Sequence, residues 1–467
     1  MGEKFLTINQ PEIYFHFGVT LHETGSSQKA AGIFEFILQN ADRFAKYDDI
    51  IAYYTKILRT KKEFRKALNY MQYLEINSRD DEYYRQISND YLQIGGQEKA
   101  KEFLMHIIEK TDDDLLKLAD LQFATQDYEM AKYSFGKLAE KTGDLQHFEM
   151  LGEIAFLQED FLEAAINYKK IIDKLGDDFA NHKNIRKISK ENIIALYRIE
   201  NRPKAETLQN KFKNTLTEND ENEIELHRGI YYIEMDKKKA KSIFTKLLKK
   251  QNLSQNVAIT AYFWRGVAFL KSNEKEEAKN DFTIVSRSVD KDLSNQAHLK
   301  LGTINFSDEN FKEALAHYSE VIQNDEDGKL AFDATRNFAF VCKTMKEWQK
   351  AIAAYQLILE RWGDEDLEAK TLFDIAFCYY RDKKFSKAIE MFERTISILE
   401  KEEERAEAQY WIGHSYFEME NYEKAISELL KVKYNYGDIA QWSATAELLI
   451  GEAYTKNGKI SKAKEAY

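Results

Sequence analysis

The chain has 467 residues, 43% of them hydrophobic and 31% charged, and 68 basic against 79 acidic side chains give a formal net charge of −11. This negative balance argues against nonspecific nucleic-acid binding, which needs basic surface to neutralise phosphates. No apolar run reaches the roughly 18 residues of a membrane span, and residues 1–20 lack the basic start and apolar core of a signal peptide. We therefore expect a soluble protein without a direct membrane span, in the cytoplasm or the periplasm.

An alanine recurs along the whole chain at intervals of 31 to 41 residues, followed in most cases four residues later by a large apolar side chain. Self-similarity on this scale predicts a stack of small units rather than a globule. The alanines are Ala30, Ala67, Ala100, Ala131, Ala164, Ala205, Ala240, Ala278, Ala314, Ala351, Ala388, Ala425 and Ala463.

Each unit has apolar positions at three- and four-residue intervals on both sides of a short polar break, clearest over residues 409–432. This spacing predicts two amphipathic helices joined by a tight turn. Small residues such as Gly413 and Ala425 let the two helices cross closely, and large side chains fill the gaps beside the crossing. We expect about 26 helices in 13 pairs, an all-α fold without a sheet.

The units differ in regularity along the chain, and this predicts four segments. Residues 1–14 form an N-terminal lead-in and residues 15–176 the N-terminal repeats. Residues 177–258 are degenerate repeats, and residues 259–467 are regular C-terminal repeats. Tyr467 falls in the middle of an expected second helix, so we expect the array to be cut within a repeat.

This pattern resembles the tetratricopeptide repeat over nearly the whole chain. With the positions of that repeat numbered from one, Gly413 takes position 8, Tyr416 position 11, Tyr422 position 17, Ala425 position 20 and Leu429 position 24. The resemblance, which is to long bacterial-type arrays, implies an α-solenoid of about 13 helix-turn-helix repeats wound into a right-handed superhelix. The residues that anchor the regular repeats are Gly302, Ala314, Ala351, Ala388, Gly413, Ala425, Gly451 and Ala463.

The chain departs from the family at position 32, where a proline is common. Only two prolines occur, and four repeats instead carry glycine followed by aspartate. We expect the glycine to end one helix in a left-handed conformation and the aspartate to cap the next. The glycines are Gly143, Gly176, Gly363 and Gly437.

No catalytic or metal-binding pattern emerges from the sequence. His22-Glu23 begins like a zinc-protease motif but lacks the second histidine, and the nine histidines are scattered without ligand spacing. Cys342 and Cys378 occupy core positions of adjacent repeats, where a thiol is most simply a small packing group. A disulfide between these two repeats stays open as an alternative. We expect no enzyme activity, no cofactor and no metal.

The resemblance implies that positions 2, 5, 9 and 12 of each first helix line a concave groove. From residue 260 to 420 these positions are aromatic with a basic fringe, whereas in the N-terminal half they include Glu149 and Glu153. About half of the aromatics should pack between units, and the rest should form an exposed stripe that binds a partner. The predicted groove residues are Phe263, Arg336, Phe340, Lys343, Lys370, Phe373, Phe377, Tyr380, Arg381, Tyr410, His414 and Phe417.

We interpret the chain as a non-catalytic scaffold that binds a protein or peptide with apolar anchors and acidic character in its groove. The chaperone-tail clamp known in this family is broken, because Phe340 and Asp374 stand where the clamp needs other residues. Two alternatives stay open: a regulatory module of a larger enzyme or sensor, and an edge-assembled component of a bacterial envelope or flagellar-motor machine. The second is a fold-level association only.

Overall fold

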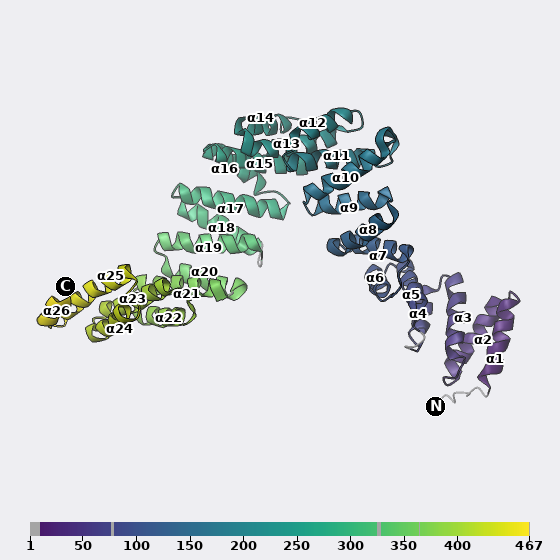
Figure 1. Cartoon of the computed structure of the whole chain (residues 1–467), viewed down its shortest axis with the longest axis horizontal. Coiled ribbons are helices and arrows are strands. Elements are labelled where there is room, and N and C mark those ends of the chain that lie inside the picture. Colours follow the sequence, from purple (N-terminus) through teal and green to yellow (C-terminus); the bar gives the residue numbers. More distant parts are fainter. Residues whose placement is uncertain (1–9, 76–78, 325–327, 364, 467) are drawn as a thin grey trace. The chain divides into compact units, whose positions relative to one another are not determined.

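The computed structural model describes residues 10–75, 79–324, 328–363 and 365–466, and within these ranges the chain is helical with no strand (Figure 1). These described ranges comprise 26 α-helices and one short 3-10 helix, η2. The all-α prediction is therefore confirmed. The chain divides into two compact units: unit 1 is Met1–Asp220 and unit 2 is Glu221–Tyr467.

Unit 1 contains the first twelve α-helices and the 3-10 helix η2, and α13 (Glu218–Met235) begins at its end. The helices are α1 (Pro11–Glu23), α2 (Ser27–Asn40), α3 (Tyr47–Thr60), α4 (Phe64–Met71), α5 (Asp81–Gln93), α6 (Gln97–Met105), α7 (Asp112–Ala124), α8 (Tyr128–Thr142), α9 (Leu145–Leu157), α10 (Phe161–Leu175), η2 (Gly176–Asn181), α11 (Ile185–Arg198) and α12 (Arg202–Lys211).

Unit 2 contains most of α13 and all later helices. They are α14 (Lys237–Leu247), α15 (Gln255–Lys271), α16 (Lys275–Val285), α17 (Lys291–Ser307), α18 (Phe311–Asn324), α19 (Lys329–Thr344), α20 (Trp348–Trp362), α21 (Glu365–Arg381), α22 (Phe385–Ile398), α23 (Glu402–Glu418), α24 (Tyr422–Asn435), α25 (Ala440–Lys456) and α26 (Ile460–Ala466).

Odd-numbered helices are the first and even-numbered helices the second members of the predicted pairs. From α1 to α12 and from α14 to α26 each helix packs against the next one in the chain (Figure 1). First helices of neighbouring pairs also touch, as α9 and α11 do in unit 1 and α15 and α17, α17 and α19, and α23 and α25 do in unit 2. Neighbouring first helices thus share one face, as a stack of paired helices requires.

The recurring small residues lie where two helices cross. None of the thirteen anchor alanines is more than 3% exposed. A Cβ atom added to Gly302 would lie 2.6 Å from the ring of Tyr318, and one added to Gly413 would lie 2.6 Å from Cγ of Leu429. Since real Cβ atoms do not come so close, glycine is required by the side chain sixteen residues later.

The turns within the pairs are tight and share one conformation. Nine of them place a non-glycine residue in the left-handed region with φ between 59° and 62°, for example Lys62 and Glu420. The amide of the next residue then closes the first helix, as Glu63 N–H does by donating to the carbonyl of Leu58 at 2.9 Å. Few L-residues adopt this conformation without cost, so packing of the two helices holds these turns in place.

The predicted glycine-aspartate junction is confirmed at one position. Gly143 is left-handed with φ 65°, and the Asp144 side chain accepts a hydrogen bond from Gln146 N–H at 2.9 Å, capping α9. Gly176 also has a positive φ of 53°, but it opens the 3-10 helix η2 rather than a direct passage to α11. An extra turn of helix therefore intervenes in the degenerate region.

At the other two junctions the predicted role of glycine is wrong. Gly363 is extended, with φ −63° and ψ 120°, and Gly437 is not left-handed either. A Cβ atom on Gly363 would lie 2.6 Å from the carbonyl oxygen of Leu359, and one on Gly437 would lie 2.8 Å from that of Lys433. Glycine is needed there because the chain passes close to the preceding helical turn. Asp364 lies outside the described residues.

The two cysteines are free and fully buried, on α19 and α21. Burial raises the pKa of the Cys342 thiol to about 11 and that of Cys378 to about 12. Both are therefore neutral packing groups, and the alternative of a disulfide between them is not realised.

Candidate partner-binding surface

The first helices of unit 2, from α15 to α25, carry the predicted groove positions, and we call the side they share the first-helix face. Side-chain contacts join its members one after another. Phe306 of α17 meets Phe340 of α19 at 5.5 Å between ring centres, and Lys343 of α19 pairs with Asp374 of α21 at 2.6 Å. Further along the chain, contacts between aromatic rings join α21 to α23 and α23 to α25.

An aromatic cluster forms the C-terminal part of this face. Tyr380 of α21 lies 5.0 Å from Trp411 and 5.4 Å from His414 of α23, between ring centres. Tyr410 of α23 lies 5.3 Å from Trp442 of α25. The members of the aromatic cluster are Phe377, Tyr380, Tyr410, Trp411, His414, Phe417 and Trp442. All but Tyr410 are half-buried, so the edges of their rings remain accessible.

The aromatic cluster is uncharged near neutral pH. The Tyr380 hydroxyl oxygen and Nδ1 of His414 are 3.0 Å apart, at hydrogen-bond distance. Burial raises the pKa of Tyr380 to about 12 and lowers the pKa of His414 below its usual value. Because the phenol of Tyr380 keeps its proton and the imidazole of His414 is neutral, the cluster offers apolar area with polar but uncharged groups at the ring edges.

The other predicted aromatics divide between surface and core. Phe340 is 53% exposed, the clearest exposed ring of the predicted set. Phe263 is 3% exposed and packs 5.7 Å from the ring of Phe282, so its side chain belongs to the core. Phe373 is half-buried beside Phe392, at 5.3 Å between ring centres. Phe263 therefore offers no surface to a partner.

The predicted basic side chains along the first-helix face are partly paired with carboxylates of the same chain. Lys343 is held by Asp374, as described above, whereas Lys370 and Arg381 are exposed. Arg336 is 60% exposed and makes a 3.2 Å pair with Asp333 one helical turn away, an exposed geometry that contributes little to stability. Arg336 and Arg381 thus remain able to meet an acidic group.

A cavity of about 580 Å³ opens beside the aromatic cluster, between α21 and the start of α23. Its lining is more acidic than basic: Ala369, Lys370, Phe373, Asp374, Ile398, Leu399, Glu400, Lys401, Glu404 and Glu407. Burial raises the pKa of Glu407, which accepts a hydrogen bond from Trp411 Nε1 at 3.4 Å. The structure thus brings the predicted Lys370 and Phe373 together with carboxylates that were not part of the predicted site.

Two members of the cluster, Trp411 and Trp442, were not among the predicted groove residues. Trp411 sits at position 6, outside the groove positions implied by the resemblance. Trp442 precedes its repeat in that numbering, yet α25 already begins at Ala440. The available signal was composition, since tryptophan occurs only five times in the chain.

The acidic positions of the N-terminal half are engaged within unit 1. Glu149 is buried and accepts a hydrogen bond from the Asn184 side chain. Glu153 pairs with Lys187 at 2.5 Å. These carboxylates connect α9 with the α11 region instead of forming an open acidic stretch.

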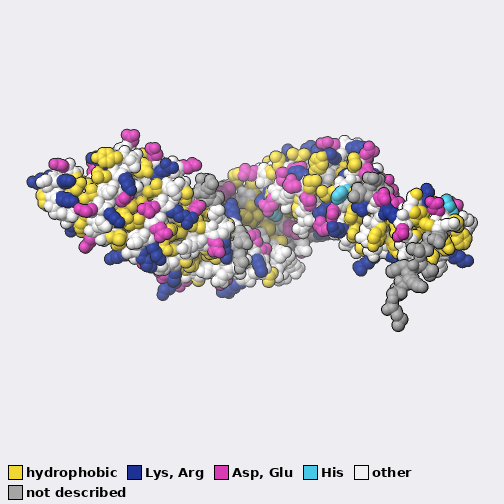
Figure 2. All heavy atoms as spheres, turned by 90° about the horizontal axis from the view of Figure 1, so that it is seen from below, with side chains coloured by type: hydrophobic (Ala, Val, Ile, Leu, Met, Phe, Trp, Pro, Cys, Tyr) yellow, Lys and Arg dark blue, Asp and Glu magenta, His cyan; other side chains and the backbone are white. Residues whose placement is uncertain are grey.

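Within the described ranges no group of three or more His, Cys, Asp or Glu side chains is placed to hold a metal ion. Over the same residues no helix is long and apolar enough to cross a membrane. Figure 2 shows basic, acidic and hydrophobic side chains interspersed on the face in view, without a large region of one sign. Paired helices stacked with a shared first-helix face define a helical-repeat protein.

Comparison with known families identifies these repeats. Family models described as Tetratricopeptide repeat match residues 265–329, 330–401 and 406–437. Most of residues 265–437 thus match the tetratricopeptide repeat, and this match supports a protein-protein interaction scaffold in general. None of the curated proteins matches the sequence.

Two solved structures are among those to which the chain is similar. "Crystal structure of MamA protein" is 19% identical, covers 37% of this chain and 87% of that chain, and has a TM-score of 0.31. "Crystal structure of APC/C hetero-tetramer Cut9-Hcn1" is 12% identical, covers 96% of this chain and 97% of that chain, and has a TM-score of 0.28.

Proposed function

We propose that the protein is a non-catalytic scaffold that holds a segment of a protein partner on the first-helix face of unit 2. The observation that carries this proposal is the aromatic cluster. Large rings of α21, α23 and α25 contact one another yet stay partly accessible. Aromatic side chains of this kind supply much of the binding energy in protein interfaces.

The partner would present apolar anchors to Phe340 and to the aromatic cluster. Its acidic groups would lie near Arg336 and Arg381, because Lys343 is already neutralised by Asp374. They would avoid the cavity beside α23, whose carboxylates repel negative charge. The partner segment thus has an acidic end toward α19 and an apolar, uncharged end toward α25.

The test is affinity purification with the full chain as bait, followed by quantitative mass spectrometry. A variant carrying Phe340→Ala, Tyr380→Ala and Arg336→Glu should lose the partner. Hot-spot residues contribute about 2 kcal/mol or more each, so affinity should fall at least roughly 30-fold. The helical circular-dichroism signal should be unchanged, since these side chains are exposed or half-buried.

The matched control is Tyr434→Ala on the second helix α24, because Tyr434 is 75% exposed and outside the first-helix face. This variant should keep the partner. If it loses the partner while the first-helix variant retains it, the scaffold assembles through its second helices, as the edge-assembled alternative requires.

A further inference from the structure

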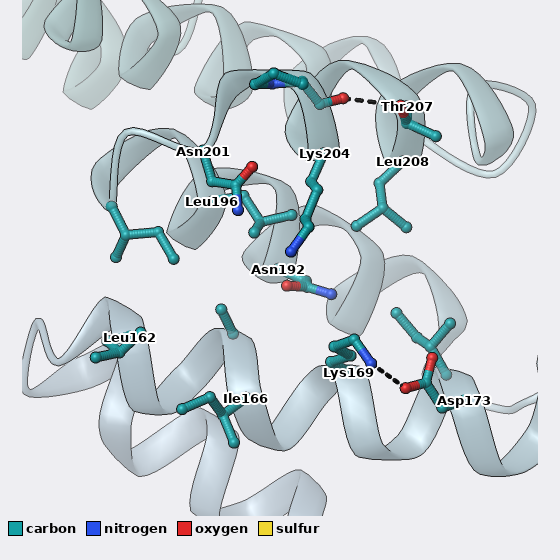
Figure 3. Close-up of a pocket in the computed structure, with 14 residues that line it drawn as sticks. Leu162, Ile166, Lys169, Asp173, Asn192, Leu196, Asn201, Lys204, Thr207 and Leu208 are labelled. Atoms are coloured by element: carbon teal, nitrogen blue, oxygen red, sulfur yellow. Dashed lines mark hydrogen bonds and ion pairs between the residues drawn. The ribbon is translucent and has the colours of Figure 1, made fainter.

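Unit 1 contains an apolar cavity of about 470 Å³ on its second-helix side, in the degenerate region (Figure 3). Its walls are the second helices α10 and α12, and its floor is the first helix α11. Leu162 and Ile166 project from α10 and are 58% and 47% exposed, while Leu196 and Leu208 face them from the other two helices. The cavity is lined mainly by aliphatic side chains that no residue of this chain covers in the described structure.

The floor of the cavity carries a departure from the commonest residue at its repeat position. Thirteen residues before the anchor alanine, several repeats place a buried leucine or isoleucine (for example Ile87, Leu118, Leu151, Leu301, Ile375 and Ile412), whereas the repeats of Ala278 and Ala351 place Arg265 and Phe338 there. In the repeat anchored by Ala205 this position is Asn192. Asparagine has the same branched skeleton as leucine but ends in an amide, so it places a polar group at the floor of the apolar cavity between α10 and α12.

Asn192 is itself unsatisfied. It is 2% exposed, and its Oδ1 has no hydrogen-bond partner among the described residues. A buried amide without a partner costs free energy, which a bound group with a donor would recover. Asn192 therefore points to a ligand that brings a polar group as well as apolar area.

The charges around the cavity favour an acidic ligand. Lys169 and Asp173 pair with each other on α10. Lys204 of α12 extends its ammonium group toward the cavity floor near Asn192 (Figure 3), and it has no ion pair in the described part of the chain. After the α10 pair is set aside, the lining has one uncompensated positive charge.

We propose that this cavity is a second binding site, which takes a segment of a protein partner. The segment inserts a branched apolar side chain between Leu162 and Leu208, gives a hydrogen-bond donor to Asn192 and places a carboxylate on Lys204. A peptide fits better than a small molecule, because exposed Leu162 and Ile166 extend the apolar lining one helical turn along α10. The site lies in unit 1 and is independent of the first-helix face of unit 2.

The test is selection of random 12-residue peptides, displayed on phage, against the immobilised full chain. Selected peptides should combine a branched apolar residue with an acidic one. Synthetic copies should bind at least about tenfold more weakly to Asn192→Leu, which removes the amide that accepts the hydrogen bond, and to Leu162→Lys, which places a charge at the rim of the cavity. Met130→Lys is the matched control, since Met130 is 43% exposed on the second helix α8 and should leave binding unchanged.

Charge reversal sharpens the test. Lys204→Glu should weaken the selected acidic peptides, and copies with lysine in place of the acid should recover binding to this variant. The proposal fails if no peptide is enriched, if Asn192→Leu binds the peptides as wild type does, or if Met130→Lys weakens them equally. The proposal also fails if the fatty acid dodecanoate binds in the cavity and no peptide does, because the site would then take a small apolar acid instead of a protein segment. Circular dichroism of each variant shows whether the helices are retained, and Leu162→Lys, an exposed substitution, keeps the test valid if Asn192→Leu does not fold.

Discussion

The two units connect neighbouring first helices by different means. In unit 1 three connections are charged pairs whose aspartate is buried: Arg59–Asp90, Arg85–Asp114 and Arg186–Asp220, with aspartate side chains 2%, 3% and 6% exposed. Two other connections of unit 1 differ, since α9 and α11 are joined by the more exposed pair Lys187–Glu153 and α1 and α3 by the rings of Phe15 and Tyr53. In unit 2 the corresponding pair, Lys343–Asp374, has side chains 24% and 26% exposed. Aromatic ring contacts join the later helices of unit 2.

This difference bears on where a partner can bind. A carboxylate paired with arginine inside the stack is already satisfied; for Asp114, burial alone would raise the pKa, but hydrogen bonds from Thr111 and Arg85 keep the pKa below its usual value. Rings in contact with one another keep accessible edges. Unit 1 therefore uses its first-helix positions for internal cohesion, whereas unit 2 leaves part of them open for recognition.

The largest effect is expected from removing an arginine in unit 1. Arg59 makes a two-pronged contact with Asp90, with three donor–acceptor distances of 2.9 Å. Arg59→Leu leaves a buried carboxylate without its partner, which should cost about 3–5 kcal/mol. Hydrogen exchange of the full chain, read by mass spectrometry, should show faster exchange in α3 to α6.

The equivalent change in unit 2 is Lys343→Leu, and it should cost less than about 1 kcal/mol because water reaches both partners of its pair. If Lys343→Leu destabilised its helices as strongly as Arg59→Leu does, the proposed difference between the units would be wrong. The double change Arg59→Leu with Asp90→Leu should recover much of the loss, because no buried charge then remains.

An intermediate effect, similar in both units, is expected at the helix crossings. Ala164 and Ala388 are fully buried. Ala164→Leu and Ala388→Leu should each overpack one crossing at a cost of about 1–3 kcal/mol. The damage should stay within the changed repeat and its neighbours, as hydrogen exchange of the separate helices can show. Unchanged exchange around Ala388→Leu would mean that the repeat positions are misassigned there.

The smallest effect is expected from pH, and it should separate the units. Burial lowers the pKa of His298, His317 and His414, all in unit 2. The unfolded chain, with histidine pKa values near 6.5, takes up protons before the folded unit does. The stability that these histidines contribute is therefore present above about pH 6.5 and is lost as the pH falls through the lowered pKa values.

Unit 1 should respond in the opposite sense over part of this range. Burial raises the pKa of Glu191, which also accepts a hydrogen bond from Tyr168. The folded unit binds this proton before the unfolded chain, so acidification favours the folded state there. Between about pH 7.5 and 5.5, exchange corrected for its intrinsic pH dependence should rise in α17, α18 and α23 but not in α10 and α11. Equal changes in both units would contradict this assignment.

The repeat and its helices followed from the sequence because local rules govern them. Alanine at each crossing, glycine opposite a large side chain and apolar spacing on two helices need only a few neighbouring residues. The four-segment division stays a prediction, and the division of the chain into two compact units at residue 220 was not anticipated from the sequence. The prediction that Gly363 and Gly437 end their helices in a left-handed conformation was wrong. The sequence shows that a glycine is present, but it does not show which backbone carbonyl lies close to it.

The binding surfaces depended on contacts between repeats, which the sequence does not display. The position numbering placed Phe263 and Tyr380 in the same predicted groove, yet packing against Phe282 buries the first while the second remains accessible. Asn192 was not singled out by any pattern in the sequence. By itself the sequence determined the helix pairs and the class of protein, since these rest on periodicity within about 36 residues. Only the tertiary structure decided which side chains stay uncovered, because exposure depends on the volumes that neighbouring repeats bring to the same space.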